Sequence, residues 1–234
     1  MNNNFFYIPR LCDADLQNAL QSSGAVLIEG AKWCGKTSTA SNACRSMLYM
    51  QDPDKTSSYL ATADAKPSLL LKGEIPRLID EWQMAPVLWD AVRFEVDKRG
   101  EPGQFILTGS AVPSDNVTAH TGTGRISRLL LRPMSLFESR ESNGAVSLRA
   151  LFDGETEVEA NSDLSIENIA FVICRGGWPA SVKQKGSIAL RMALKNGHSN
   201  FSQTSPGRPI YRYSCTEDKS GRHTERFSIL WFPF

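Results

Sequence analysis

One segment of the sequence has the residue types and the spacing needed to hold the phosphates of a nucleotide. Residues 30–37 fit the pattern G-x-x-x-x-G-K-[ST] at every fixed position. Glycines let the backbone wrap a phosphate with its N–H groups, and the N-terminus of the following helix favours negative charge. Lys36 can reach the β- and γ-phosphates, and Thr37 offers a hydroxyl to Mg²⁺. The alternative interpretation is a glycine turn before an amphipathic helix.

Nine consecutive residues are therefore predicted to contact the nucleotide. They are Gly30, Ala31, Lys32, Trp33, Cys34, Gly35, Lys36, Thr37 and Ser38. Cys34 is a special case, because a thiol at a helix N-terminus often has a lowered pKa. We hypothesise that oxidation of Cys34 would block nucleotide binding.

Two acidic residues close the apolar run of residues 77–81, at a predicted strand end. Open α/β sheets bind ligands at the carboxyl ends of their strands, so Asp80 and Glu81 are expected near the phosphate loop. Asp80 would hold Mg²⁺ through water, and Glu81 would orient and deprotonate an attacking water. A solvated strand end or a helix N-cap is the alternative.

Two further side chains are candidates for catalysis. Ser110 follows the predicted strand of residues 104–108, where its hydroxyl could sense the γ-phosphate or the nucleophilic water; we prefer it to Thr108, which could still belong to the strand. Arg125 leaves a Gly/Thr/Ser-rich loop and could neutralise transition-state charge, in cis or on a neighbouring subunit. The alternatives are an ordinary β-turn at Ser110, and a surface role for Arg125 and its neighbour Arg128.

Alternating strand-like and helix-like segments must position these residues. Short apolar runs predict strands at residues 25–28, 47–50, 77–81, 104–108 and 129–131. Helical patterns cover residues 9–23, 36–46 and 86–99, with Gly100 at the expected C-terminal cap. Such alternation favours parallel βαβ units covered on both faces, in a core that spans residues 24–133.

Composition excludes several classes of function. The net charge of +1 gives no global electrostatic case for nucleic acid or an anionic membrane. Five scattered cysteines without a C-x-x-C pair argue against zinc and fit a reducing cytosol. The start lacks the features of a signal peptide, and no apolar stretch is long enough to cross a bilayer. We therefore expect a cytoplasmic protein without a membrane partner.

Five motifs in order make the chain similar to a known family. They lie at residues 27–37, 49–54, 77–83, 105–110 and 124–126. This series resembles prokaryotic AAA-type P-loop ATPases, whose ATPase core precedes a C-terminal domain of unknown function. The resemblance implies a P-loop NTPase three-layer sandwich with a mainly parallel sheet, ATP rather than GTP as ligand, and a core of Lys36, Thr37, Asp80, Glu81 and Ser110. It names no client; an unidentified protein or DNA and a homo-oligomer remain expectations.

The resemblance weakens towards the end of the chain. We expect the ATPase core at residues 1–133 and the start of a mostly helical second domain at residues 134–194. Residues 195–234 lose periodicity and are expected to be an atypical, disordered tail, as in a truncated or frameshifted reading frame; a native variable tail is the alternative.

Three other functions remain open beside a magnesium-dependent ATPase. They are a nucleotide-gated interaction module or relic that binds ATP without turnover, a DNA-associated regulator, and a kinase-like phosphotransferase, for which no acceptor pocket is marked.

Overall fold

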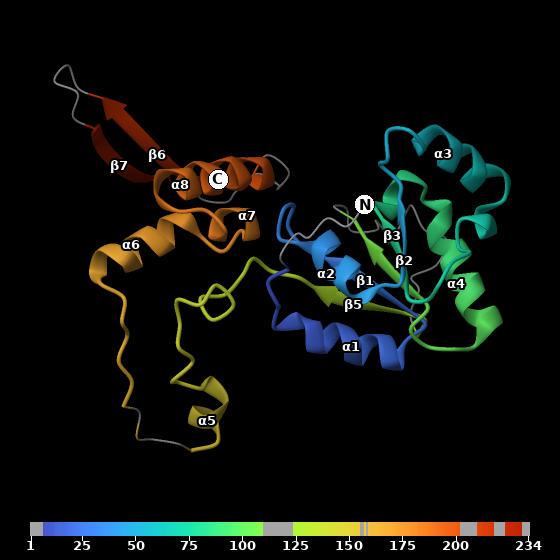
Figure 1. Ribbon diagram of the computed structural model, residues 1–234, viewed down its shortest axis with the longest axis horizontal. Coiled ribbons are helices and arrows are strands. Elements are labelled where there is room, and N and C mark those ends of the chain that lie inside the picture. Colours follow the sequence, from blue (N-terminus) through green and yellow to red (C-terminus); the bar gives the residue numbers. More distant parts are fainter. Residues whose placement is uncertain are drawn as a thin grey trace. The chain divides into compact units, whose positions relative to one another are not determined.

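A five-stranded parallel sheet forms the centre of the first part of the chain (Figure 1). Its strands are β1 (Ala25–Glu29), β2 (Ser46–Tyr49), β3 (Arg77–Asp80), β4 (Phe105–Thr108) and β5 (Ile126–Leu130). They are ordered β2-β3-β4-β1-β5, and every neighbouring pair is parallel. All five carboxyl ends therefore meet at one edge of the sheet.

The computed structural model describes residues 7–109, 124–154, 157, 159–201, 210–217 and 223–230. Beyond residue 196 it describes the backbone alone. Contacts divide the chain into one unit at residues 1–196 and a second at residues 197–234.

Helices cover both faces of the sheet and complete three layers, so the predicted α/β sandwich is confirmed (Figure 1). The helices of this region are α1 (Cys12–Ser22), α2 (Lys36–Ala43), α3 (Thr56–Ala65) and α4 (Val87–Arg99), with short 3₁₀ turns η1 (Pro67–Leu69) and η2 (Trp82–Met84). Alternate residues of the strands point to opposite faces. Leu27 and Leu107 pack with α3 and α4, and Val26 and Ile106 pack with α1 and α2.

In the part of the chain that the structure describes, four helices follow β5. They are α5 (Leu148–Phe152), α6 (Ile166–Arg175), α7 (Pro179–Val182) and α8 (Gly186–Phe201), of which α8 continues into the second unit. Ser165 caps α6, because its hydroxyl accepts a hydrogen bond from the backbone N–H of Asn168 at 3.2 Å. The partition at residue 133 stays a prediction.

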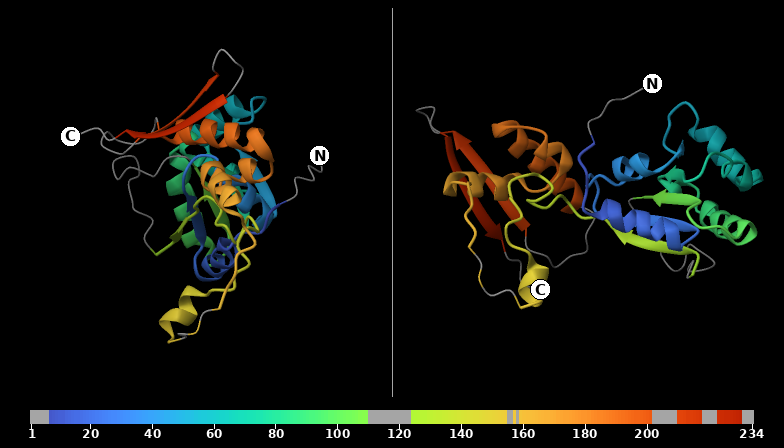
Figure 2. Two further views of the ribbon diagram at one scale, coloured as in Figure 1. Left: turned by 90° about the vertical axis from the view of Figure 1, so that its left-hand side faces the viewer. Right: turned by 60° about the horizontal axis from the view of Figure 1, so that its bottom comes forward.

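The last part of the chain includes a two-stranded antiparallel sheet. Strand β6 (Ile210–Glu217) pairs with β7 (His223–Leu230), and the two lie side by side in both views of Figure 2. These strands fall within residues 195–234, where the sequence predicts an atypical tail. Among the described residues, no helix has the length and apolar content to cross a membrane.

Candidate nucleotide site

The phosphate loop, residues 30–37, joins the end of β1 to the start of α2. Gly30 and Gly35 have φ angles of +143° and +104°, in the region that favours glycine, and Trp33 also has a positive φ of 70°. A Cβ at Gly30 would lie 2.1 Å from the carbonyl oxygen of Leu131, so glycine is also needed for close approach to the segment after β5. Gly35, the residue before α2, has no side chain to cap this helix, and an uncapped helix N-terminus can bind a phosphate.

Lys36 is buried against its own loop. Its Nζ donates to the carbonyl oxygens of Gly30 and Ala31, at 2.8 and 3.0 Å. Its side chain therefore already lies over the loop, and phosphate oxygens could replace the two carbonyls as acceptors.

The carboxylate of Asp80 connects three elements at the carboxyl edge of the sheet. Its Oδ1 accepts hydrogen bonds from the hydroxyl of Thr37, at 2.8 Å, and from that of Thr108. Gln51, just beyond β2, donates to Oδ2 at 3.4 Å. Burial raises the pKa of Asp80 above its ordinary value, and the hydrogen bonds from Thr108 and Thr37 act in the opposite direction. The sequence motifs thus meet in space, and Gln51, within the motif at residues 49–54, contacts the site although the sequence assigned it no role.

Glu81 follows Asp80 and adopts an unusual backbone conformation. Its φ of 57° lies in the left-handed region, which residues other than glycine enter mainly at functional sites and turns. The side-chain amide of Gln83 donates to Oε2 of Glu81. Gln83 also lies against Gly109, since a Cβ on that glycine would come within 2.2 Å of the Gln83 Oε1 atom. Gln83 therefore links the predicted base to the end of β4, a role that the sequence does not reveal.

Of the two remaining catalytic candidates, the structure describes only Arg125. Ser110 lies outside the described residues, so the structure does not test its predicted role. Arg125 precedes β5, whose first residue pairs with Ala25, and so lies at the amino edge of the sheet, opposite Asp80. Its Nε lies 2.8 Å from Asp97 Oδ1 in an exposed ion pair. A role for Arg125 in cis does not fit this placement, because the parallel strands separate the two edges; a role on a neighbouring subunit stays a prediction.

The thiol of Cys34 differs from the expectation for a reactive cysteine. Its side chain is fully buried, and the Sγ atom donates to the carbonyl oxygen of Leu131 at 3.4 Å. Burial raises the pKa of Cys34, outweighing the nearby charges of Lys36 and Arg10, which act to lower it. The expected lowered pKa is therefore wrong, and the thiol is protected from oxidation by burial and protonation.

Comparison with known proteins agrees with this geometry. The family described as an AAA domain matches residues 22–139, which is half of the chain and includes the phosphate loop, β3 and β4. The chain belongs to this AAA domain family. The match ends within the segment after β5, so the family assignment covers the sheet and its site but not the later helices.

Solved structures add only a distant similarity to this AAA domain protein. One is a structure of C. elegans PCH-2, with 13% sequence identity and a TM-score of 0.37, covering 76% of this chain and 61% of the other. A search of curated proteins found no match. The family assignment therefore rests on the sequence match and on the fold described above.

The donor set fits Mg²⁺ bound together with nucleotide phosphates. Mg²⁺ prefers one or two protein oxygen ligands and keeps waters or phosphate oxygens for its other positions. Among residues in the described parts of the chain, no group of three or more His, Cys, Asp or Glu side chains could hold a metal. The hydroxyl of Thr37 and the buried carboxylate of Asp80 are the oxygens available beside the loop. This set suits an ion that arrives with its nucleotide.

The hydroxyl of Thr108 provides a test of the cluster. Valine has the shape of threonine without the hydroxyl, so Thr108→Val would remove one hydrogen bond from the buried Asp80 carboxylate. For a site that hydrolyses ATP, we expect this substitution to lower the turnover number by roughly tenfold or more, because catalysis needs preorganised polar groups. Steady-state phosphate release measures it. Thr62→Val, which removes a hydroxyl bonded within α3, is the control. Unchanged turnover in Thr108→Val would contradict the role of the cluster.

Proposed function

We propose that this AAA-type chain binds Mg·ATP at residues 30–38 and hydrolyses it. The observation that carries the proposal is the shared contact of Thr37 and Thr108 with Asp80, beside the phosphate loop. The side chains marked by separate motifs converge there, at the carboxyl edge where open α/β sheets bind ligands. An isolated glycine turn would not require such convergence.

Each residue of the site has a proposed role in phosphoryl transfer. Backbone N–H groups of the loop and the ammonium of Lys36 would hold the phosphates and stabilise their charge. Thr37 and Asp80 would hold Mg²⁺, which supplies positive charge opposite the phosphate oxygens. Glu81 would accept a proton from the attacking water and orient it in line with the bond that breaks. The protein thus contributes positioning and electrostatic stabilisation rather than covalent chemistry.

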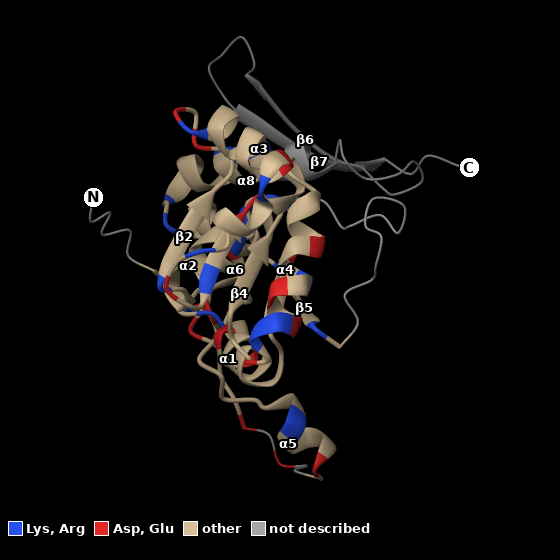
Figure 3. Ribbon diagram, turned by 90° about the vertical axis from the view of Figure 1, so that its right-hand side faces the viewer, with Lys and Arg blue, Asp and Glu red and all other residues tan. Residues whose placement is uncertain are grey.

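The preference for ATP over GTP and the assembly of the chain belong to the same proposal. Both follow from the family resemblance, and Arg125 would act only from a neighbouring subunit of a homo-oligomer. A DNA client has less support, because net charge is +1 and charges of both signs are interspersed along α4 (Figure 3).

Phosphate release tests the proposal against its non-enzymatic alternative. We expect the purified chain to release phosphate from ATP in the presence of Mg²⁺. This release should stop when EDTA removes the metal. GTP should be a poorer substrate at equal concentration. Binding of ATP without any release would reject the ATPase and favour a nucleotide-gated module.

A further inference from the structure

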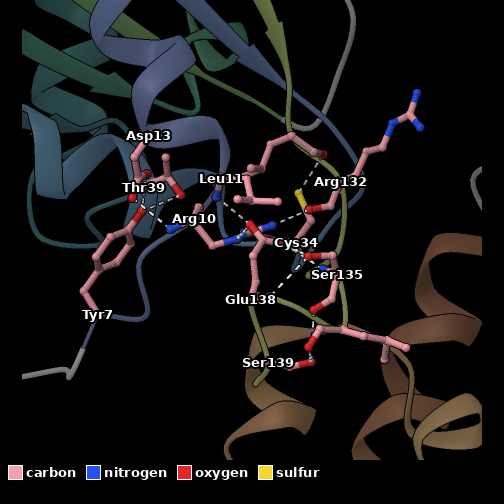
Figure 4. Close-up of polar contacts among 12 residues, drawn as sticks. Tyr7, Arg10, Leu11, Asp13, Cys34, Thr39, Arg132, Ser135, Glu138 and Ser139 are labelled. Carbon is pink, nitrogen blue, oxygen red and sulfur yellow. Dashed lines mark hydrogen bonds and ion pairs between the residues drawn. The ribbon is translucent and has the colours of Figure 1, made fainter. Parts of the chain in front are cut away.

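A buried arginine outside all the nucleotide motifs contacts the phosphate loop (Figure 4). Arg10 lies just before α1, and its side chain is only 4% exposed. Its guanidinium donates to the carbonyl oxygens of Cys34 at 3.0 Å and of Arg132 at 2.7 Å, and to Glu138 Oε1 at 2.9 Å. Arg10 thus joins the loop to the segment of residues 132–138, whose contacts with Arg10 span 122 and 128 residues of sequence.

The neighbours of Arg10 hold its backbone in place. Its N–H donates to Asp13 Oδ2 at 2.8 Å, and the hydroxyl of Tyr7 donates to the other oxygen of Asp13 at 2.6 Å. That hydroxyl also lies 3.3 Å from Thr39 Oγ1 in α2 (Figure 4). The backbone of Arg10 is therefore held by Asp13, which Tyr7 links to α2, and its guanidinium is held by the phosphate loop.

Glu138, the acidic partner of Arg10, is oriented by its own turn. Ser135 and Glu138 form a reciprocal capping pair: the Ser135 N–H donates to Oε2 at 2.7 Å, and the Glu138 N–H donates to the serine hydroxyl at 3.2 Å. The N–H of Leu11 donates to Oε1 at 2.8 Å. Burial alone would raise the pKa of Glu138, but the N–H groups of Ser135 and Leu11 and the charge of Arg10 together lower it. The carboxylate is therefore charged at neutral pH.

A second buried ion pair continues from the same turn. Glu141 Oε1 accepts a hydrogen bond from Nη1 of Arg175, the last residue of α6, and the side chain of Arg175 is 5% exposed. Nε of Arg175 donates to the carbonyl oxygen of Gly176 at 3.1 Å. The turn at residues 135–141 therefore holds one charged partner from the N-terminal segment and one from the end of α6.

The segment after α6 returns to the phosphate loop. The N–H of Met134 donates to the carbonyl oxygen of Gly177 at 2.7 Å, and a Cβ at Gly177 would lie 2.0 Å from the Met134 oxygen. A Cβ at Gly35 would lie 3.3 Å from Nη1 of Arg10 and 3.5 Å from Pro179 Cγ. The loop thus has Arg10 and the start of α7 as close neighbours.

We propose that Arg10 is a positioning residue for the phosphate loop, and that the ion pairs Arg10–Glu138 and Glu141–Arg175 couple nucleotide binding to the turn at residues 135–141 and the segment at residues 175–179. The inference rests on the proposed nucleotide site. Separating a buried ion pair costs much free energy. A shift of the Cys34 carbonyl oxygen would therefore move Arg10 and Glu138 together. Coupling of this kind is reciprocal. If ATP changes the affinity for a partner that binds residues 175–179, that partner changes the affinity for ATP by the same factor.

Hydrogen exchange of the wild-type chain tests the coupling directly. The N–H groups of Leu11, Met134 and Ser135 report on the contacts described above. We expect saturating Mg·ATP to slow exchange in peptides that cover residues 134–141 and 175–179 by roughly threefold or more. The same peptides of Lys36→Ala should show no change at an Mg·ATP concentration that saturates the wild type but lies well below the raised Kd of the variant. ATP binding to the wild type without any change in these peptides would overturn the inference.

A double-mutant cycle separates coupling from a general loss of stability. We expect Arg10→Ala to raise the Kd for Mg·ATP by roughly tenfold. Glu138→Ala should do the same although Glu138 does not touch the loop, and the double variant should be no weaker than Arg10→Ala alone. Arg10→Lys should not restore affinity, because one ammonium cannot reproduce the planar fork of donors. Arg99→Ala, which breaks the 2.8 Å pair with Glu95 on α4, is the matched control.

The two proposals fail in different ways. Absence of ATP binding by the folded wild-type chain would reject the nucleotide site itself. Wild-type binding with affinity unchanged in both Arg10→Ala and Glu138→Ala would reject only the positioning role. Thermal unfolding of each variant identifies those that are folded, and the exchange experiment needs no variant that disturbs the ion pairs.

Discussion

Lys36→Ala is expected to weaken Mg·ATP binding by roughly a hundredfold, equivalent to about 2.7 kcal/mol. The ammonium of Lys36 is the buried positive charge within the phosphate loop, 2.8 Å from the Gly30 carbonyl oxygen. Alanine removes the charge-assisted hydrogen bonds that it would donate to phosphate oxygens. The Kd from equilibrium titration measures the effect.

A lysine of α4 serves as the control for this variant. Lys98→Ala also removes one positive charge, but its side chain is 65% exposed and lies on α4 near Glu95. We expect its Kd to match that of the wild type. An unchanged Kd in a folded Lys36→Ala protein would show that the loop does not bind phosphates.

Glu81→Gln is expected to lower ATP turnover by roughly a hundredfold or more, with Kd changed by no more than about threefold. Glutamine has nearly the same shape and can still accept the hydrogen bond from the Gln83 amide, but it cannot take a proton from water. Binding depends on the loop and Lys36, which the substitution leaves intact. Single-turnover phosphate release, measured beside equilibrium binding, separates the two effects.

Glu101→Gln is the isosteric control for Glu81→Gln. Glu101 is exposed and precedes β4, at the opposite end of that strand from the site. Equal turnover in wild type and Glu81→Gln would contradict the role of Glu81 as general base. If wild type and Glu81→Gln both bound ATP and neither hydrolysed it, the result would favour a nucleotide-gated module over an ATPase.

Local sequence patterns predict the sheet because each of its strands is a short apolar run, which is typical of a buried strand. The predicted limits of β1, β2, β3 and β4 agree with the structure to within one residue. Gly100 has a φ of 71° and ends α4 as expected, since glycine adopts this conformation without strain. Helix α3 was missed because it buries only Ala63 and consists mainly of Ser, Thr and Ala, so it lacks an apolar stripe.

The candidate site was predictable only where one motif contains the chemistry. The spacing of Gly30, Gly35 and Lys36 reflects a loop that is local in sequence. The contact between Arg10 and Glu138 spans 128 residues and follows from folding, so no spacing rule indicates it. The register of β5 likewise places Arg125 at the amino edge of the sheet. Its position after a glycine-rich loop does not indicate that register.

Calorimetric titration of the wild-type chain with Mg·ATP, with GTP as competitor, tests the central claim most directly. We expect saturable binding of one ATP per chain with a micromolar Kd, displaced poorly by GTP and weakened by roughly a hundredfold in Lys36→Ala. No binding of Mg·ATP by a protein shown to be folded would contradict it.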